Sequence, residues 1–267
     1  MTEHRAMRGP APRWDPSLYL RHGAERSRPF LDLVGRIAGD ARTVVDLGCG
    51  PGHLSAVLRE RWPQAHVHGI DSSAEMIGRA QQQNTDPSVT FEQADVSRWY
   101  PDPPVDVMVS NALFQWVRQA QAVVTRLAEH VVGGGTFALQ VPHNFEAPSH
   151  VLLHEIASRP PYAEHTEGLH EARGSDAGSW LELFAGLGWR VDAWTTTYQH
   201  VLPGDDPVFS WISGTGARPI LQALPDGLRA RFEREYRAAL RTAYPRRPWG
   251  TVLPFERVFV VAQRPQA

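Results

Sequence analysis

The most constraining feature of this 267-residue chain is a short apolar run that ends directly in a glycine-rich turn. Residues 43–47 (TVVDL) are mostly β-branched and apolar, which predicts a strand buried on both faces of a parallel sheet. The next five residues, GCGPG, place Gly48, Gly50 and Gly52 where the backbone must turn sharply. In open α/β sheets, ligands bind beyond the carboxyl ends of the strands. The segment therefore predicts a ligand site in an α/β domain.

Strands and helices alternate after this turn, which is typical of βαβ units in a parallel sheet with helices on both faces. The run Gly133-Gly134-Gly135 is expected to break a helix before the next strand begins. Strands are expected over residues 43–47, 65–70, 89–93, 105–110, 136–141, 190–200 and 257–263, and helices over residues 29–39, 53–61, 72–83, 118–131, 147–157 and 176–186.

The chain is expected to be organised in five segments. Residues 1–13, rich in Pro and Arg, are expected to form a disordered leader, and residues 14–40 a helical arm over the active site. Residues 41–201 are expected to form the α/β core, and residues 254–267 its final strand. Residues 202–253 are helix-rich and far too long for an ordinary connection, which favours a helical cap or lid.

Composition excludes several classes of protein. Lys+Arg 27 against Asp+Glu 29 gives a net charge of −2, so no basic field attracts nucleic acid. No apolar stretch approaches the roughly 20 residues that span a bilayer, and the N-terminus has no apolar signal region. The single Cys49 excludes an intramolecular disulfide, and the 12 histidines show no ligand spacing for a metal. We expect a cytoplasmic monomer that binds no nucleic acid, membrane or metal.

Three acidic residues lie where ligand contacts are expected. Asp46 precedes the first glycine by two residues, Asp71 ends the second expected strand, and Asp95 follows the third. A dinucleotide-binding turn would carry its third glycine at position 53, where the chain has His53. A carboxylate beside the turn suits a cationic ligand better than a diphosphate, which disfavours a nicotinamide-dependent dehydrogenase.

The segments DLGCGPG, GIDSS and ADV resemble the cofactor motifs of class I S-adenosylmethionine-dependent methyltransferases over about residues 40–145. The resemblance implies an α/β, Rossmann-like sheet that is mostly parallel with an antiparallel last strand. It implies S-adenosylmethionine as cofactor, S-adenosylhomocysteine as product and no metal. The expected cofactor-binding residues are Asp46, Gly48, Cys49, Gly50, Gly52, Asp71, Ser72, Met76, Asp95, Val96 and Asn111.

Three of these residues have a second interpretation. Met76 is equally well explained as an apolar helix residue that faces the sheet. Asn111 follows the fourth expected strand, where it could face either the cofactor or the acceptor. The Cys49 side chain is expected to pack, while its backbone lines the turn.

A second resemblance covers nearly the whole chain, from Trp14 to Arg264. The segments WDPSLYLRHGAERSRP, SNALFQWV, QVPHN, TTYQH, WISGTGARP and FERVFVVA are similar to those of the trans-aconitate 2-methyltransferase family. The resemblance implies monomethyl esterification of a small polycarboxylate such as trans-aconitate. The expected substrate-binding residues are Tyr19, His22, Arg26, Gln115, Trp116, His143, Arg218 and Arg257.

The expected chemistry needs no catalytic acid or base. A carboxylate has a pKa of about 4 and is already ionised at neutral pH, so positioning and removal of water are sufficient. Two alternatives stay open: a class I methyltransferase that acts on another small acceptor, and a protein that binds S-adenosylmethionine without catalysis.

Overall fold

We analysed a computed structural model of the chain, which describes residues 23–169 and 174–266, with residues 23–26 described by their backbone alone. The expected leader, Tyr19 and His22 lie outside this part of the chain, as does the side chain of Arg26.

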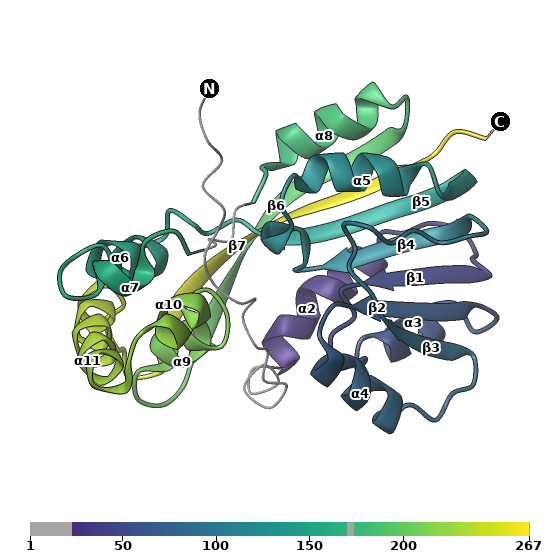
Figure 1. The fold of residues 1–267 in the computed structure, drawn as a ribbon. Coiled ribbons are helices and arrows are strands. Elements are labelled where there is room, and N and C mark those ends of the chain that lie inside the picture. The colour runs from purple at the N-terminus through teal and green to yellow at the C-terminus, as the bar shows by residue number, and fades with distance from the viewer. Residues whose placement is uncertain (1–22, 170–173, 267) are drawn as a thin grey trace, which may run out of the picture. The chain divides into compact units, whose positions relative to one another are not determined.

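The described residues form a mixed α/β structure (Figure 1). The strands are β1 (Thr43–Leu47), β2 (His66–Asp71), β3 (Val89–Gln93), β4 (Val105–Asn111), β5 (Val131–Pro142), β6 (Arg190–Leu202) and β7 (Thr251–Gln263). The helices are α2 (Gly23–Val34), α3 (Ser55–Arg61), α4 (Ala74–Gln83), α5 (Ala120–Ala128), α6 (Pro148–Ala157), α7 (Ala163–Thr166), α8 (Ala177–Gly186), α9 (Pro207–Ser213), α10 (Arg218–Ala223) and α11 (Asp226–Ala243), with a 3₁₀ helix, η1 (Phe114–Trp116).

Tertiary contacts divide the described chain into two units. The larger unit contains residues 23–143, 174–197 and 256–266, and the smaller unit contains residues 144–169 and 198–255. The smaller unit thus includes the segment expected as a cap, together with the α6–α7 region that precedes α8.

One seven-stranded sheet has the order β3-β2-β1-β4-β5-β7-β6, and it confirms the expected Rossmann-like fold. The pairs from β3 to β5 are parallel, whereas β7 runs antiparallel to β5. Strand order reverses at β1, which lies between β2 and β4. In such sheets this reversal marks the ligand site, and it coincides here with the glycine-rich turn.

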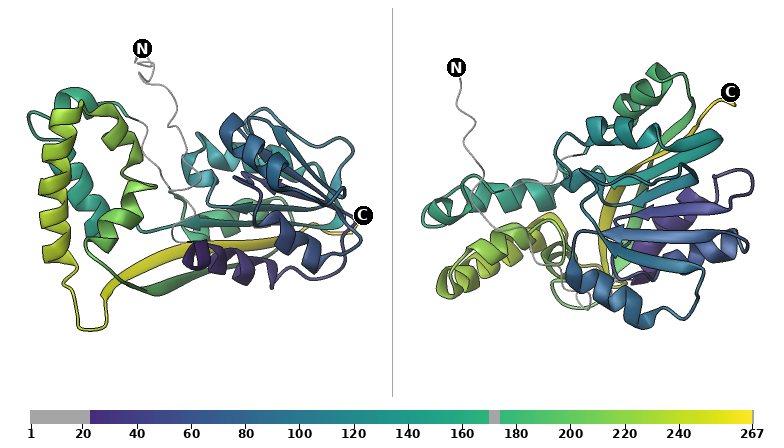
Figure 2. Two further views of the ribbon diagram at one scale, coloured as in Figure 1. Left: turned by 90° about the horizontal axis from the view of Figure 1, so that it is seen from below. Right: turned by 45° about the vertical axis from the view of Figure 1, so that its right-hand side comes forward.

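Helices cover both faces of the sheet in the larger unit (Figure 2), and the side chains of β1 point alternately toward one face and the other. Val45 and Leu47 belong to a buried cluster with residues of α5 and α8. Asp46 points to the other face, where it contacts α3. The last four residues of β1 are buried, as the apolar run predicted.

The expected start of β5 at residue 136 is wrong, because the strand begins at Val131 and includes the three glycines. Gly134 has φ +81°, and the register with β4 shifts between Val105 and Val107. An added Cβ on Gly135 would lie 2.6 Å from the carbonyl oxygen of Asp106. The glycines therefore admit an irregularity within the strand, where the sequence pattern suggested a helix break.

The smaller unit has its own apolar core, in which α11 packs against α6 and α9. Tyr162 and Phe232 are buried in it and meet edge to face at 5.1 Å. Within residues 23–169 and 174–266, no helix is long and apolar enough to cross a membrane.

Gly135→Ala should lower the free energy of unfolding by about 1–3 kcal/mol, because its methyl group would overlap backbone atoms. Gly78→Ala in α4 is the matched control, since its added Cβ meets nothing within 4 Å. Removing a helix-interior glycine should stabilise the protein by up to about 1 kcal/mol. Urea denaturation of both variants tests this, and equal midpoints would contradict the close approach at Gly135.

Candidate functional site

The glycine-rich turn after β1 is fixed by backbone hydrogen bonds to β2. The amides of Gly48 and Cys49 donate to the carbonyl oxygen of Ile70, at 2.8 and 2.9 Å. Gly48, Gly50 and Gly52 have φ values of +74°, +56° and +80°, which side-chain-bearing residues rarely adopt. The three glycines are therefore required by the backbone path itself.

Space around the turn differs from one glycine to the next. A Cβ on Gly48 would lie 3.0 Å from Leu113, and one on Gly52 would lie 2.7 Å from Phe91. A Cβ on Gly50 would meet nothing within 4 Å. The turn is thus packed on two sides and borders open space at Gly50, where a ligand can approach the main chain.

Asp46 is a buried carboxylate directly behind this turn, with 2% of its surface exposed. Its Oδ2 accepts a hydrogen bond of 3.1 Å from the Ser55 hydroxyl, at the start of α3. Burial raises the pKa of Asp46 to about 7, against the lowering effect of Ser55, and Asp71 adds a smaller upward shift. A cation beside Asp46 would favour its ionised form.

Asp71 ends β2 and holds two backbone amides. Its Oδ2 accepts from Gly50 at 3.0 Å and its Oδ1 from Ser73 at 2.8 Å. Burial raises the pKa of Asp71, and the two amide bonds act in the opposite direction. Each carboxylate oxygen keeps a second lone pair for a ligand hydroxyl. Ser72, the next residue, accepts at its carbonyl from Gln93 of β3 at 3.1 Å.

Asp95 follows β3 and is exposed. Its Oδ1 accepts from the amide and hydroxyl of Ser97, at 2.9 and 2.8 Å, and these bonds hold the pKa of Asp95 below its usual value. The adjacent Val96 is buried in the apolar cluster of the larger unit. Met76 on α4 is also buried, which agrees with its interpretation as an apolar helix residue.

Cys49 packs inside the turn with 5% of its surface exposed. Burial raises the pKa of its thiol, and the nearby Asp46 and Asp71 carboxylates raise it further. The side chain therefore stays protonated and unreactive at neutral pH, as a packing role requires.

The carboxyl ends of β4 and β5, together with the middle of β7, bring a second group of polar residues to the side of the sheet where β1 ends. Asn111 pairs with Gln140, and Pro142 pairs with Arg257 on the antiparallel β7. Nη1 of the buried Arg257 donates to Oε1 of Gln140 at 2.9 Å. Gln140 was not among the residues expected from the sequence; its signal there is an amide within the otherwise apolar run FALQV.

Several buried polar atoms in this group are available to a ligand. Gln115 uses its Nε2 to donate to the Ala112 carbonyl at 2.6 Å. Oε1 of Gln115, Oδ1 of Asn111 and Nε2 of Gln140 have no hydrogen-bond partner among the described residues. Buried polar groups are normally satisfied, so these atoms indicate a polar ligand or water at this edge.

The other predicted substrate residues are divided between the two units. His143 is partly exposed, and its Nδ1 lies 2.8 Å from Oε1 of Glu256. Trp116 ends η1 in the same unit. Arg218 begins α10 in the smaller unit, where it is buried. Arg26 belongs to α2, in the larger unit.

Comparison with known proteins identifies the family. Residues 44–135 match the family model described as "Methyltransferase domain". The trans-aconitate 2-methyltransferase of Streptomyces coelicolor is 44% identical, covering 96% of this chain and 88% of the relative. Those of Streptomyces avermitilis and Mycobacterium sp. (strain KMS) are 41% and 43% identical, covering 95% and 94% of this chain and 97% and 99% of the relatives.

Solved structures share the fold at low identity. A putative methyltransferase from Bacillus halodurans has a TM-score of 0.57 at 13% identity, covering 89% of this chain and 98% of that one. Haemonchus contortus phosphoethanolamine N-methyltransferase 2, in complex with S-adenosyl-L-methionine, has a TM-score of 0.55 at 15% identity, covering 90% of this chain and 53% of that one.

The sheet order, the turn after β1 and these matches define a class I S-adenosylmethionine-dependent methyltransferase. More narrowly, the chain belongs to the trans-aconitate 2-methyltransferase family.

Asp46→Asn should remove a pH-dependent cost of folding. Because the pKa of Asp46 is about 7 in the folded protein and 3.8 for an ordinary aspartate, folded protein retains a proton that unfolded protein loses, and stability falls as pH rises from about 4 to 7. Relative to wild type, the variant should therefore gain stability over this range, by up to about 4 kcal/mol above pH 7.

Urea denaturation from pH 4 to 8, without ligand, measures this difference. Asp40→Asn, at an exposed position, is the control and should run parallel to wild type. Parallel curves for Asp46→Asn and wild type would contradict the raised pKa.

Proposed function

We propose that the protein transfers the methyl group of S-adenosylmethionine to a carboxylate of trans-aconitate, or of a related small polycarboxylate. The products are a monomethyl ester and S-adenosylhomocysteine. The observation that carries this proposal is 40–44% identity to trans-aconitate 2-methyltransferases over about 95% of the chain. The acidic residues beside the glycine-rich turn and the buried polar atoms near the ends of β4 and β5 support it.

The turn after β1 fits the cofactor. When bound, S-adenosylmethionine supplies a methyl group on a cationic sulfur. We infer that the backbone around Gly50 borders the methionine part, because open space adjoins the chain there, and that Asp46 stabilises its positive charge. Asp71 would accept from the ribose hydroxyls with its spare lone pairs, and Asp95 from the adenine amino group.

The residues that we propose for the cofactor site are those expected from the sequence: Asp46, Gly48, Cys49, Gly50, Gly52, Asp71, Ser72, Met76, Asp95, Val96 and Asn111. Cys49 contributes its backbone, because its side chain is buried and protonated.

The reaction is an in-line displacement. An oxygen of the ionised acceptor carboxylate forms a bond to the methyl carbon, the carbon–sulfur bond breaks, and its electron pair remains on sulfur. No proton moves, so no side chain is needed as a general base. The protein lowers the barrier by holding the reacting atoms in line and excluding water, effects that can supply roughly 7–11 kcal/mol.

Arg257 is suited to bind an acceptor carboxylate. A guanidinium donates two parallel hydrogen bonds to a carboxylate, and Gln140 restrains the orientation of this one. Its position opposite Pro142 places it at the edge of the sheet where β1 and β4 also end. The remaining proposed acceptor residues are Tyr19, His22, Arg26, Gln115, Trp116, His143 and Arg218.

We further propose that the smaller unit acts as the cap and that the enzyme is a cytoplasmic monomer. Light scattering coupled to gel filtration should then give a mass of about 29.8 kDa.

Purified protein should convert trans-aconitate to a singly methylated product that base hydrolyses, because a carboxyl ester is formed. The panel would also contain cis-aconitate, citrate, isocitrate and a simple phenol, with products followed by mass spectrometry. Preference for the phenol would indicate the alternative acceptor class. Absence of any product, with S-adenosylhomocysteine binding intact by calorimetry, would indicate a non-catalytic binding protein.

Arg257→Met should raise the KM for trans-aconitate roughly tenfold to hundredfold, which corresponds to the loss of a charged hydrogen bond. The KM for S-adenosylmethionine should change little. Arg257→Lys keeps the charge but cannot donate two parallel hydrogen bonds, so its KM for trans-aconitate should be intermediate. Arg190→Met, an exposed arginine on β6, is the control. An acceptor KM unchanged in folded Arg257→Met would remove Arg257 from the site.

A further inference from the structure

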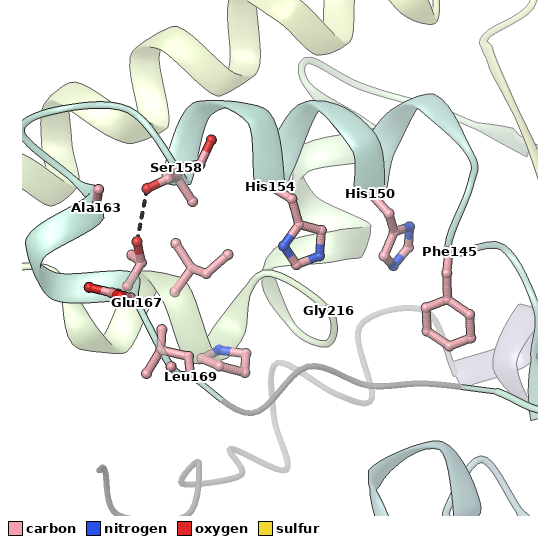
Figure 3. A pocket seen from close by; sticks show the side chains of 13 residues that line it. Phe145, His150, His154, Ser158, Ala163, Glu167, Leu169 and Gly216 are labelled. Carbon is pink, nitrogen blue, oxygen red and sulfur yellow. Dashed lines mark hydrogen bonds between the residues drawn. The ribbon is translucent and has the colours of Figure 1, made fainter. Parts of the chain in front are cut away.

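The smaller unit contains a cavity of about 420 Å³ that no sequence pattern indicated (Figure 3). It lies beside α6 and α7 and the segment before α10, within one unit of the fold. Its size falls within the range of small-molecule sites. Two histidines one helical turn apart, His150 and His154, project into it from α6.

His150 is held in a defined position by its neighbour Ser149. The hydroxyl of Tyr236 donates to the Ser149 carbonyl at 2.5 Å, and the Ser149 amide donates to the hydroxyl of Tyr244 at 3.1 Å. The Ser149 hydroxyl lies 3.3 Å from Nδ1 of His150. The start of α6 is thus fastened to α11, and Nδ1 is occupied within the protein.

The opposite side of the imidazole ring is left for the cavity. Phe145 packs on the ring edge to face at 5.8 Å. A Cβ on Gly216 would lie 2.9 Å from Nε2 of His150, so only glycine at this position allows the ring to pack so close to the backbone. The ring is therefore restrained on two sides, and Nε2 lies near Gly216 in the lining of the cavity.

The charge state of His150 suits a hydrogen-bond donor. Burial lowers the pKa of His150 to about 4, with a smaller contribution from His154, so the ring is neutral at physiological pH. A neutral imidazole that keeps Nδ1 for Ser149 can present an N–H at Nε2. His150 lies in the first turn of a ten-residue helix, whose N-terminal partial positive charge also favours an anion.

The rest of the cavity lining would favour one orientation of a bound ligand. Leu169, Pro219 and Ile220 supply an apolar wall. Glu167 lines the end remote from Phe145 and His150, as Figure 3 shows. Repulsion from Glu167 directs an anionic group of the ligand toward the histidines, and its carbon skeleton toward the apolar wall.

We propose that this cavity holds the acceptor acid, with a carboxylate accepting from Nε2 of His150 and the carbon skeleton on the wall formed by Leu169, Pro219 and Ile220. The inference rests on the proposed function, because that function supplies the ligand class. It makes His150 a specificity-determining residue for the acceptor.

Two substitutions separate this role from a structural one. His150→Asn retains an amide near the position of Nδ1 and loses the group at Nε2, whereas His150→Gln places an amide nitrogen near Nε2. His165→Asn replaces an exposed histidine of the same unit outside the cavity lining and is the control. Thermal melting checks that each variant is folded.

With trans-aconitate, His150→Asn should raise the acceptor KM roughly tenfold to hundredfold, as expected for loss of a hydrogen bond to a charged group. The KM for S-adenosylmethionine should stay unchanged, and His150→Gln should recover most of the loss. Wild-type acceptor KM in folded His150→Asn, or equal losses in both variants, would overturn the cavity assignment and leave the proposed function intact.

Calorimetry shows which of the two proposals fails, the proposed function or the assignment of the acceptor to the cavity. Trans-aconitate would be titrated into wild type and His150→Asn saturated with S-adenosylhomocysteine. Binding that is lost in His150→Asn, without methylation by wild type, would support the cavity and overturn the proposed function. Absence of binding to wild type by any acid of the panel would overturn both.

Discussion

Burial of the Asp46 carboxylate at the carboxyl end of β1 is the interaction on which the candidate cofactor site depends. The Ser55 hydroxyl ties this carboxylate to the helix that follows the turn, and the turn itself is bonded to β2 through Ile70. Asp71 then binds the turn from β2. Since parallel strands end at one edge of a sheet, the two carboxylates lie close to the glycine-rich turn, which borders open space at Gly50, and this arrangement suits a cationic ligand.

In the proposed reaction the protein positions its substrates and supplies no acid or base. An acceptor that is already ionised needs donors of fixed orientation, and each of the two donors proposed above is restrained by a neighbour. Arg257 is restrained by Gln140 in the larger unit, and His150 is restrained by Ser149 in the smaller one. In each case, a neighbouring polar group limits the freedom of the residue proposed to contact the acid, which lowers the entropic cost of binding.

Local sequence patterns predicted the elements that depend on local interactions. The buried run before Gly48, the helix that follows it and the alternation through residue 110 needed only periodicity and turn chemistry. The glycines of β5 were misassigned, because their place in a strand depends on its register with β4. Gln140 was missed because its partner, Arg257, lies 117 positions away. His150 was missed because the cavity beside it forms only when α6 and the Gly216 segment pack together.

The central claim is that an ionised carboxylate is methylated without a general base, beside a turn whose Asp46 must be charged to bind the cofactor. The most direct test is the pH dependence of kcat and of kcat/KM for S-adenosylmethionine, with trans-aconitate saturating. We expect kcat/KM to rise with pH through a midpoint near pH 7 and to level off about one pH unit higher, since it reports the free enzyme, while kcat stays flat from pH 6 to 9. A kcat that rises tenfold per pH unit across that range would contradict it, because a proton would then have to be removed for methyl transfer.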